Sequence, residues 1–350
     1  MSKRAVLSAL AGIIAVAAPL FVSAHEVYVL THDEIAKAIT MTSPNPFSAI
    51  PSQEKLFLIW GAVVAVGMLV VLRFSVSRLF EKVFDPILVR LKKYAPFVAR
   101  LTFGLSLMAS GYFRAFFGPE LPLTTFFSPA AASIVGVLLV LLGLAIILGF
   151  MTRVMALIAL GFFVLTVIQD RTYMLTYANY LGEMILFFIL GGGLWSVDRR
   201  YGSRGLFDAA LKRVGQRLER YSFFILRILF GGALFFASFY AKFLHSNLAL
   251  STVNEYHLTQ YFPFTPLFLV LGAFIIEALL GICFAVGFEI RFAAIVFTIF
   301  LTMSILFFGE AVWPHLILFG VNLTLFFHGY DKYTLEMALF QRKRKGEPVL

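Results

Sequence analysis

Charged residues are scarce in this chain of 350 residues, since they make up only 14% of it while 60% is hydrophobic. Soluble domains average about a quarter charged residues. One aqueous core cannot bury this much apolar surface, so the sequence predicts an integral membrane protein with lipid as its main partner. The net charge of +10 is distributed almost entirely between the apolar runs. That distribution is a topology signal, and it excludes nucleic acid as a partner.

Cysteine is nearly absent, because Cys283 stands alone within an apolar run. A disulfide within one molecule is therefore excluded, as are CxxC redox chemistry and cysteine-ligated iron–sulfur clusters. The sequence also lacks a glycine-rich phosphate loop, a nucleophile elbow and a His-Glu-x-x-His motif. We therefore expect no intrinsic cofactor.

The amino terminus has the pattern of an export signal. Lys3 and Arg4 precede an apolar run, and small residues stand before a predicted cut after Ala24. We interpret residues 1–24 as a signal peptide and residues 25–55 as a short extracytoplasmic segment.

Nine further apolar runs predict transmembrane helices, all of them α-helical. The runs cover residues 56–73, 101–117, 131–150, 154–169, 178–196, 222–243, 265–287, 291–308 and 312–329. Beyond the signal, 22 Lys and Arg residues fall on one side of these helices and five on the other. The positive-inside rule then places the mature amino terminus outside the cell and the carboxy terminus in the cytoplasm. The predicted location is the cell membrane of a bacterium or archaeon.

Two parts of the chain repeat one pattern. The stretch RLTFGLSLMASGYF, from Arg100, aligns with RILFGGALFFASFY, from Arg227, and LLGLAIILGFMTR aligns with LLGICFAVGFEIR. A third block, GGGLWSVDRRYG, aligns with LFFHGYDKYT through Asp198 and Asp331. The blocks predict two tandem four-helix units, 97–201 and 222–333, which form a parallel repeat because each has an even number of helices.

The remaining segments connect or flank these units. Residues 56–73 form a lead-in helix, 74–96 and 202–221 are cytoplasmic linkers of which the first is amphipathic, and 334–350 form a basic cytoplasmic tail. Within each unit, Arg153 and Arg291 follow a glycine in a tight turn between two apolar runs. We predict that both arginines have a structural role and hold these turns at the cytoplasmic face.

The repeated blocks resemble the DoxX family of four-helix membrane proteins, which is related to the DoxD subunit of thiosulfate:quinone oxidoreductase. The second unit carries the family pattern at Arg227, Gly231, Lys242, Glu277, Gly281, Gly287 and Arg291, and the first unit carries its ending at Gly193, Trp195, Ser196 and Asp198. The resemblance implies a membrane subunit of a redox system that handles quinone and receives electrons from a partner redox subunit.

The two units depart from this pattern at different positions. In the first unit Leu139 and Ala115 stand where the second has Glu277 and Lys242, and in the second unit His328 replaces the tryptophan. If the family chemistry uses the lysine and the glutamate, the second unit carries it.

Glu277 and Lys242 are the candidate catalytic residues. Burying an ionisable group within a membrane span costs free energy, so we interpret such a residue as a functional candidate. Glu277 lies deep within its predicted span, and Lys242 is its natural counter-charge. We predict that the pair gates a proton or binds a polar head group. The alternative is a buried pair that only fixes the register of two helices.

Glu183 and His315 are the candidate cofactor-binding residues, with quinone as the expected ligand. They fall one residue apart in the alignment, near the outer ends of the two fourth helices. Glu310, His245 and His257 are expected at the same face. Haem with two histidine ligands is not expected, because the only histidines within spans lie on one helix.

The mature amino terminus suggests a different function. After cleavage, the free amine and ring of His25 offer two metal ligands and His32 a third, a set that suits copper. A permease or a copper-handling membrane protein is therefore an alternative to the redox subunit. A membrane assembly or scaffold subunit is another.

Overall fold

The computed structural model describes residues 30, 32–75, 87–169, 171–201, 206–262 and 264–340. These ranges contain helices and turns but no β-strand, which confirms the predicted all-α fold. The predicted signal peptide, His25 and residues 341–350 lie outside the described residues.

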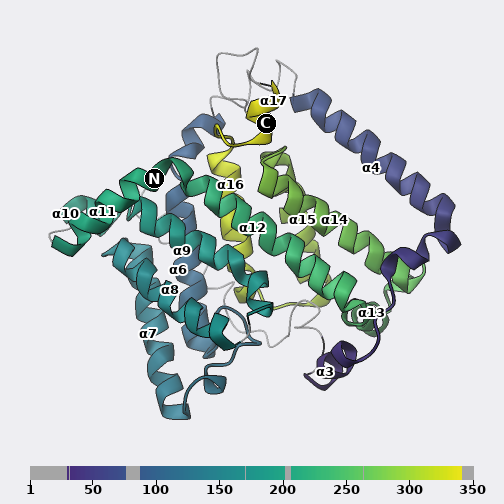
Figure 1. The fold of residues 1–350 in the computed structure, drawn as a ribbon, viewed down its shortest axis with the longest axis horizontal. Helices are drawn as coiled ribbons and strands as arrows, with labels where there is room; N and C mark the ends of the chain where they lie inside the picture. The colour runs from purple at the N-terminus through teal and green to yellow at the C-terminus, as the bar shows by residue number, and fades with distance from the viewer. Residues whose placement is uncertain are drawn as a thin grey trace.

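The long helices run roughly side by side, and short helices cover their ends (Figure 1). The long helices are α4 (Glu54–Ser75), α6 (Ala95–Phe113), α7 (Pro129–Leu148), α8 (Thr152–Gln169), α9 (Ala178–Leu190), α12 (Ser222–Ser238), α14 (Pro266–Val286), α15 (Ile290–Phe308) and α16 (Leu316–His328). The shorter ones are α3 (His32–Thr40), α10 (Val197–Tyr201), α11 (Leu206–Leu218), α13 (Ser246–Glu255) and α17 (Leu335–Phe340).

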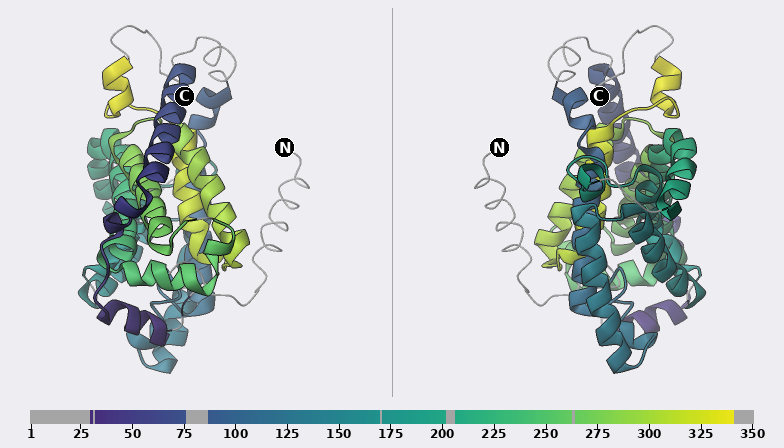
Figure 2. Two further views of the ribbon diagram at one scale, coloured as in Figure 1. Left: turned by 90° about the vertical axis from the view of Figure 1, so that its right-hand side faces the viewer. Right: turned by 90° about the vertical axis from the view of Figure 1, so that its left-hand side faces the viewer.

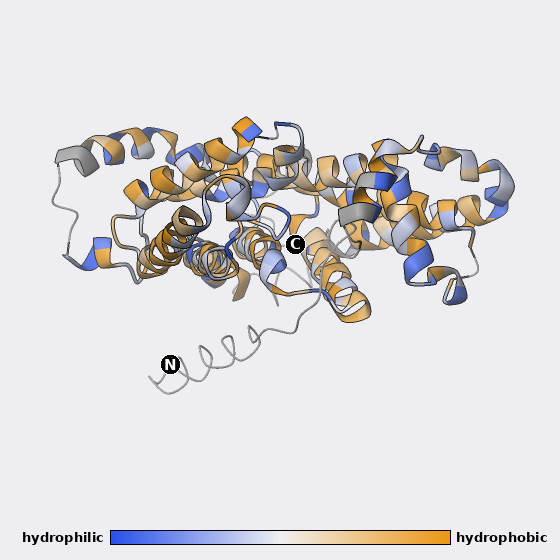
Figure 3. Ribbon diagram, turned by 90° about the horizontal axis from the view of Figure 1, so that it is seen from below, coloured by the Kyte–Doolittle hydropathy of each residue, from blue (hydrophilic) through white to orange (hydrophobic). Residues whose placement is uncertain are grey.

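Seven helical segments in the described ranges are long and apolar enough to cross a membrane. The chain is therefore a multi-pass membrane protein, and its hydrophilic residues gather in the connections and short helices (Figure 3). Sequence analysis predicted nine spans, and the two that fall short by this measure are α6 and α16. Helix α6 contains Arg100 and several small or hydroxyl-bearing residues, and α16 has only 13 residues.

Helices α6 and α16 pack against each other, and α9 packs against α12 in the same way. The first helix of each predicted unit thus contacts the last helix of the other unit. This reciprocal arrangement covers α6 and α16 with protein, so neither needs the hydropathy of a helix surrounded by lipid.

The first and second helices of each unit approach closely through glycines. A Cβ atom added to Gly104 would meet the carbonyl oxygen of Gly143, and one added to Gly231 would meet that of Gly281. Small residues of this kind allow backbones to touch, which drives helix association where lipid surrounds the protein.

The turn between the second and third helices is built alike in both units, and we call this side of the bundle the hairpin end. Gly149 and Gly287 end α7 and α14 in the left-handed conformation, with φ of 66° and 72°. Arg153 donates hydrogen bonds to the carbonyls of Ile189 and Leu190, so it ties the start of α8 to the end of α9.

Arg291 donates a hydrogen bond to the carbonyl of Phe326 in the same manner. Both predicted turn arginines therefore connect the third helix of their unit to the fourth. Their positive charge also lies close to the carboxyl end of that helix, where the helix dipole favours a cation.

The contacts at the hairpin end correct the alignment of the third block. Asp198 accepts hydrogen bonds from the amides of Met151 and Thr152, and its own amide donates to Gly149. In the second unit it is Glu336 that accepts from the amide of Glu289, and its amide donates to Gly287. The counterpart of Asp198 is therefore Glu336, which preserves the 138-residue spacing of Arg153 and Arg291.

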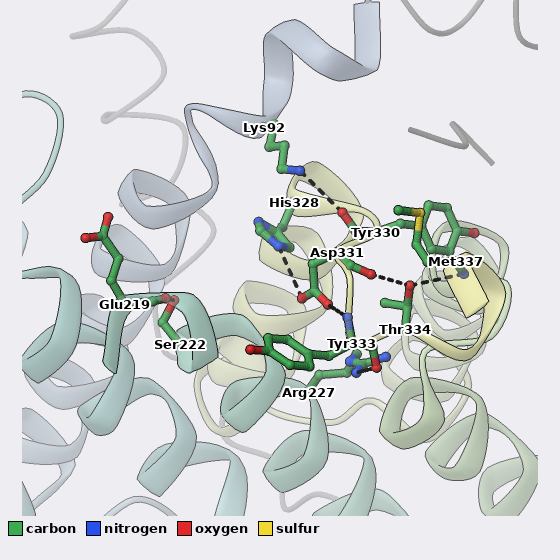
Figure 4. Close-up of polar contacts among 10 residues, drawn as sticks. All are labelled: Lys92, Glu219, Ser222, Arg227, His328, Tyr330, Asp331, Tyr333, Thr334 and Met337. Carbon is green, nitrogen blue, oxygen red and sulfur yellow. Dashed lines mark hydrogen bonds and ion pairs between the residues drawn. The ribbon is translucent and has the colours of Figure 1, made fainter. Parts of the chain in front are cut away.

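This register also changes the predicted match of Trp195. Tyr333, not His328, stands at the position of Trp195. Asp331 instead lies 3.7 Å from the ring of His328 and accepts a hydrogen bond from the amide of Tyr333 (Figure 4). The predicted tail also begins later than expected, because Glu336 bonds to the backbone of Gly287 and Glu289 in the hairpin.

The lead-in helix α4 stands apart from the bundle in Figure 1 and lies in front of it in the left view of Figure 2. No part of its most apolar window is buried within the described structure. Its first turns pack against α14 through a small cluster that includes Phe57 and Phe268. Before it, α3 lies against α13, and the hydroxyl of Ser246 donates to the carbonyl of Pro44. The amino-terminal segment is thus attached to the end of the bundle opposite the hairpins.

The glycine contact predicts a difference between two neighbouring substitutions. Gly231→Ala should lower the free energy of unfolding by about 1–3 kcal/mol, because its Cβ meets the backbone of α14. Gly232→Ala is the matched control, since nothing lies within 4 Å of its Cβ. Unfolding in mixed detergent micelles would measure both. Equal effects of the two variants would contradict the close packing of α12 on α14.

The hairpin end of the second unit should depend on pH. Burial, together with the nearby carboxyl group of Glu289, raises the pKa of Glu336 from 4.5 to about 8. The folded state therefore holds a proton that the unfolded state has lost above pH 4.5. The stabilisation is complete below that pH and disappears as the pH rises through 8.

Hydrogen exchange at the amide of Glu289, corrected for the intrinsic effect of pH, would detect this loss. Glu336→Gln should make the protection of that amide independent of pH between 5 and 9. The hairpin of the first unit, with Met151 in place of Glu289, provides an internal reference. A pH dependence that persists in Glu336→Gln would assign the effect to another group.

Candidate functional site

A cavity of about 130 Å³ lies between the two predicted units, near the end of the bundle opposite the hairpins. The first unit contributes α9 and the preceding turn Tyr173–Tyr177, and the second contributes α12, α14, α15 and the start of α16. Most of the lining is apolar. The polar or ionisable side chains that line it are Tyr173, Thr176, Tyr177, Asn179, Tyr180, Tyr240, Lys242, Glu277 and His315.

Lys242 and Glu277 meet at this cavity. The Nζ atom of Lys242 lies 3.0 Å from Oε2 of Glu277, and the two side chains are 7% and 12% exposed. Lys242 belongs to a π-helical turn, Phe239–Leu244, that continues α12. Turns of this type insert one residue into a helix and are frequent at functional sites. The two predicted catalytic residues are thus brought together at the interface between units.

The equivalent place in the first unit is filled by apolar side chains. Ala115 and Leu139, at the positions of Lys242 and Glu277, are both buried. The rings of Phe116 and Phe117 lie 5.7 Å from Phe162 and 5.6 Å from Phe163, respectively. The ion pair is therefore a property of the second unit rather than a requirement of the helical arrangement.

A second ionisable pair adjoins the cavity. Nε2 of His315 lies 3.0 Å from Oε2 of Glu310, and both side chains are buried. Nδ1 of His315 lies 3.0 Å from the carbonyl oxygen of Ala311. A carbonyl cannot donate, so Nδ1 carries a hydrogen. Nε2 and the carboxyl group of Glu310 therefore face each other beside the cavity.

The second half of the bundle matches a known family. Residues 222–310, from the start of α12 to just beyond the end of α15, match the DoxX family model. We refer to this matched range, residues 222–310, as the DoxX domain. Lys242, Glu277 and Glu310 all lie within the matched range. No curated protein and no solved structure matches the chain.

Tyrosines form the wall that faces the DoxX domain across the cavity. Tyr173, Tyr177 and Tyr180 are in successive ring contact, with centroids 6.0 Å and 5.9 Å apart. Tyr173 also lies 6.0 Å from Tyr240, and its hydroxyl donates to Glu120 at 3.3 Å. Sequence analysis missed this group. The signal was the stretch YMLTYANY, whose tyrosines are spaced by four and three residues and so share one helical face.

Glu183, the other predicted cofactor-binding residue, is fully buried but does not line the cavity. Neither of its carboxyl oxygens has a hydrogen-bond partner among the described residues. It lies one turn beyond Tyr180 on α9. Glu183 and His315 also do not occupy equivalent positions, because the corrected spacing pairs His315 with Tyr177 and Glu183 with Val321.

The other histidines in the described ranges do not line the cavity. The ring of His245 contacts Tyr240 at 4.7 Å, and His257 is exposed in a left-handed turn. His328 stacks on Phe223 at the hairpin end. His32 begins α3, and His25 lies outside the described residues. Within the described ranges no group of three potential metal ligands occurs, so copper binding at the amino terminus stays a prediction.

A double-mutant cycle would show how tightly Lys242 and Glu277 are coupled in the DoxX domain. Glu277→Met leaves a buried ammonium group, and Lys242→Met leaves a buried carboxylate, so each should lower the free energy of unfolding by about 3–5 kcal/mol. The double variant removes both charges and should be more stable than either single variant. Stability in detergent would be measured by chemical unfolding. Additive losses would show that the two side chains are not coupled.

Proposed function

We propose that this protein is the membrane subunit of a redox system and that its DoxX domain binds the head group of a quinone. The observation that carries the proposal is the shared cavity, which is lined by aromatic rings and adjoined by two ionisable pairs. A dry protein cavity of about 150 Å³ accommodates a benzene ring. The volume of about 130 Å³ is therefore of the right order for one quinone ring.

The lining suits the chemistry of quinone reduction, in which the ring accepts two electrons and two protons. The Glu310–His315 pair places a carboxyl group and an imidazole, two groups that can exchange protons, next to the cavity, and the ammonium group of Lys242 can donate a hydrogen bond to a quinone oxygen. Glu277 keeps that ammonium group in place and balances its charge. The residues thus supply binding and proton exchange rather than electron storage.

The electrons come, in this proposal, from a partner redox subunit such as a flavoprotein or a sulfur-oxidising enzyme. The predicted topology places the hairpin end in the cytoplasm and the cavity toward the outer leaflet. We further propose that the first unit is a diverged copy of the DoxX domain. Its contribution to the site is the tyrosine wall, which closes the cavity that the second unit alone leaves open.

Quinone binding by the purified protein in lipid nanodiscs tests the proposal. A short-chain ubiquinone should bind with a dissociation constant that rises at least tenfold in Glu277→Gln, because the neutral side chain no longer holds Lys242. His315→Gln should weaken binding as well. Glu255→Gln is the matched control, since this carboxylate is exposed and does not line the cavity.

The comparison also separates the quinone proposal from a scaffold role. A scaffold subunit would show no saturable quinone binding in the unmodified protein. Unchanged affinity in both Glu277→Gln and His315→Gln would remove the cavity from quinone binding, even if the protein binds quinone elsewhere.

A further inference from the structure

An open groove of about 750 Å³ lies at the hairpin end of the first unit, between the end of α7 and α10. Its apolar floor includes Ile147, Leu148 and Leu194, and its rim includes Trp195, Arg199 and Arg200. We propose that this groove binds an anionic phospholipid, with the phosphate on the two arginines and an acyl chain on the apolar floor. The proposal is independent of quinone binding.

The groove lies where a membrane-crossing helix leaves the bilayer. Helix α7 is one of the segments long and apolar enough to span, and Gly149 ends it. Leu148, its last residue, is half exposed. Trp195 next to it is 66% exposed, and tryptophan is enriched at the interface between lipid and water. An apolar floor at this level therefore faces acyl chains and head groups.

The indole of Trp195 is held by two other aromatic rings. Its centroid lies 5.5 Å from Tyr94 and 5.0 Å from Phe97. The second unit repeats this trio, since Tyr333 lies 5.3 Å from Tyr221 and 5.4 Å from Phe224. The aromatic trio thus belongs to the common architecture of the two units.

The arginines do not repeat. By the spacing that pairs Asp198 with Glu336, the counterparts of Arg199 and Arg200 are Met337 and Ala338. The architecture therefore does not require a cation at these positions. Both arginine side chains are exposed.

The acidic residue that precedes Arg199 in the chain is already engaged. The carboxylate of Asp198 accepts hydrogen bonds from two amides and a hydroxyl of the hairpin. Two arginines that line the same groove as an apolar floor match an anionic phospholipid, because arginine binds phosphate through paired hydrogen bonds. A free phosphate ion would use the rim but not the floor.

Trp195 itself can report the lipid. The chain has three tryptophans, so Trp60→Phe and Trp313→Phe leave Trp195 as the only emitter. In nanodiscs of phosphatidylcholine, small equal fractions of spin-labelled phosphatidylglycerol or spin-labelled phosphatidylcholine would be added. We expect the anionic lipid to quench Trp195 at least twofold more strongly than the zwitterionic one.

Arg199→Gln with Arg200→Gln should abolish this preference, and Arg199→Lys with Arg200→Lys should restore part of it. Arg213→Gln with Arg217→Gln is the matched control, since it removes the same charge from exposed positions on α11 and should leave the preference unchanged. Equal quenching by the two lipids in the parent protein would overturn the proposal. So would a preference that survives in the Arg199 and Arg200 variant or is lost in the control.

Discussion

A guanidinium group within a membrane protein must find hydrogen-bond acceptors, and this requirement organises both units. Arg100 donates to the carbonyls of Leu194 and Trp195, and Arg227 donates to that of Tyr333. Each arginine thereby ties the start of the first helix to the backbone that follows the fourth helix. These same first and fourth helices form the contacts between the units. The cavity lies at the interface that these helices form.

The two units share this framework but differ in what they place within it. Phenylalanines fill the interior of the first unit at the level where the second has the pair of Lys242 and Glu277. Conversely, the arginines beside Trp195 have apolar counterparts in the second unit. Both units have thus kept the packing residues, while the Lys242–Glu277 pair lies at the end of the second unit opposite the hairpins and the exposed arginines lie at the hairpin end of the first.

The sequence predicted best the charged residues whose burial in a membrane costs free energy. Charges within apolar runs are rare, so Lys242 and Glu277 could be singled out and paired before any contact was known. The first two repeat blocks aligned because their arginines and glycines are identical. The third block was aligned incorrectly. In the second unit a glutamate, Glu336, has the role of Asp198, whereas the alignment chose the aspartate Asp331, which lies five residues earlier.

The cavity itself was beyond prediction. Its walls come from separate segments spread between Tyr173 and Leu318, and tyrosines at the end of a predicted span look like ordinary interface residues. The mutual contact of α6 and α16 has a further consequence for biosynthesis. Helix α6 is made before the other helices of the two units, and α16, which covers it, follows the other long helices in the chain. The bundle therefore cannot close until α16 has been made, and a weakly apolar segment with a buried arginine must wait for its neighbour.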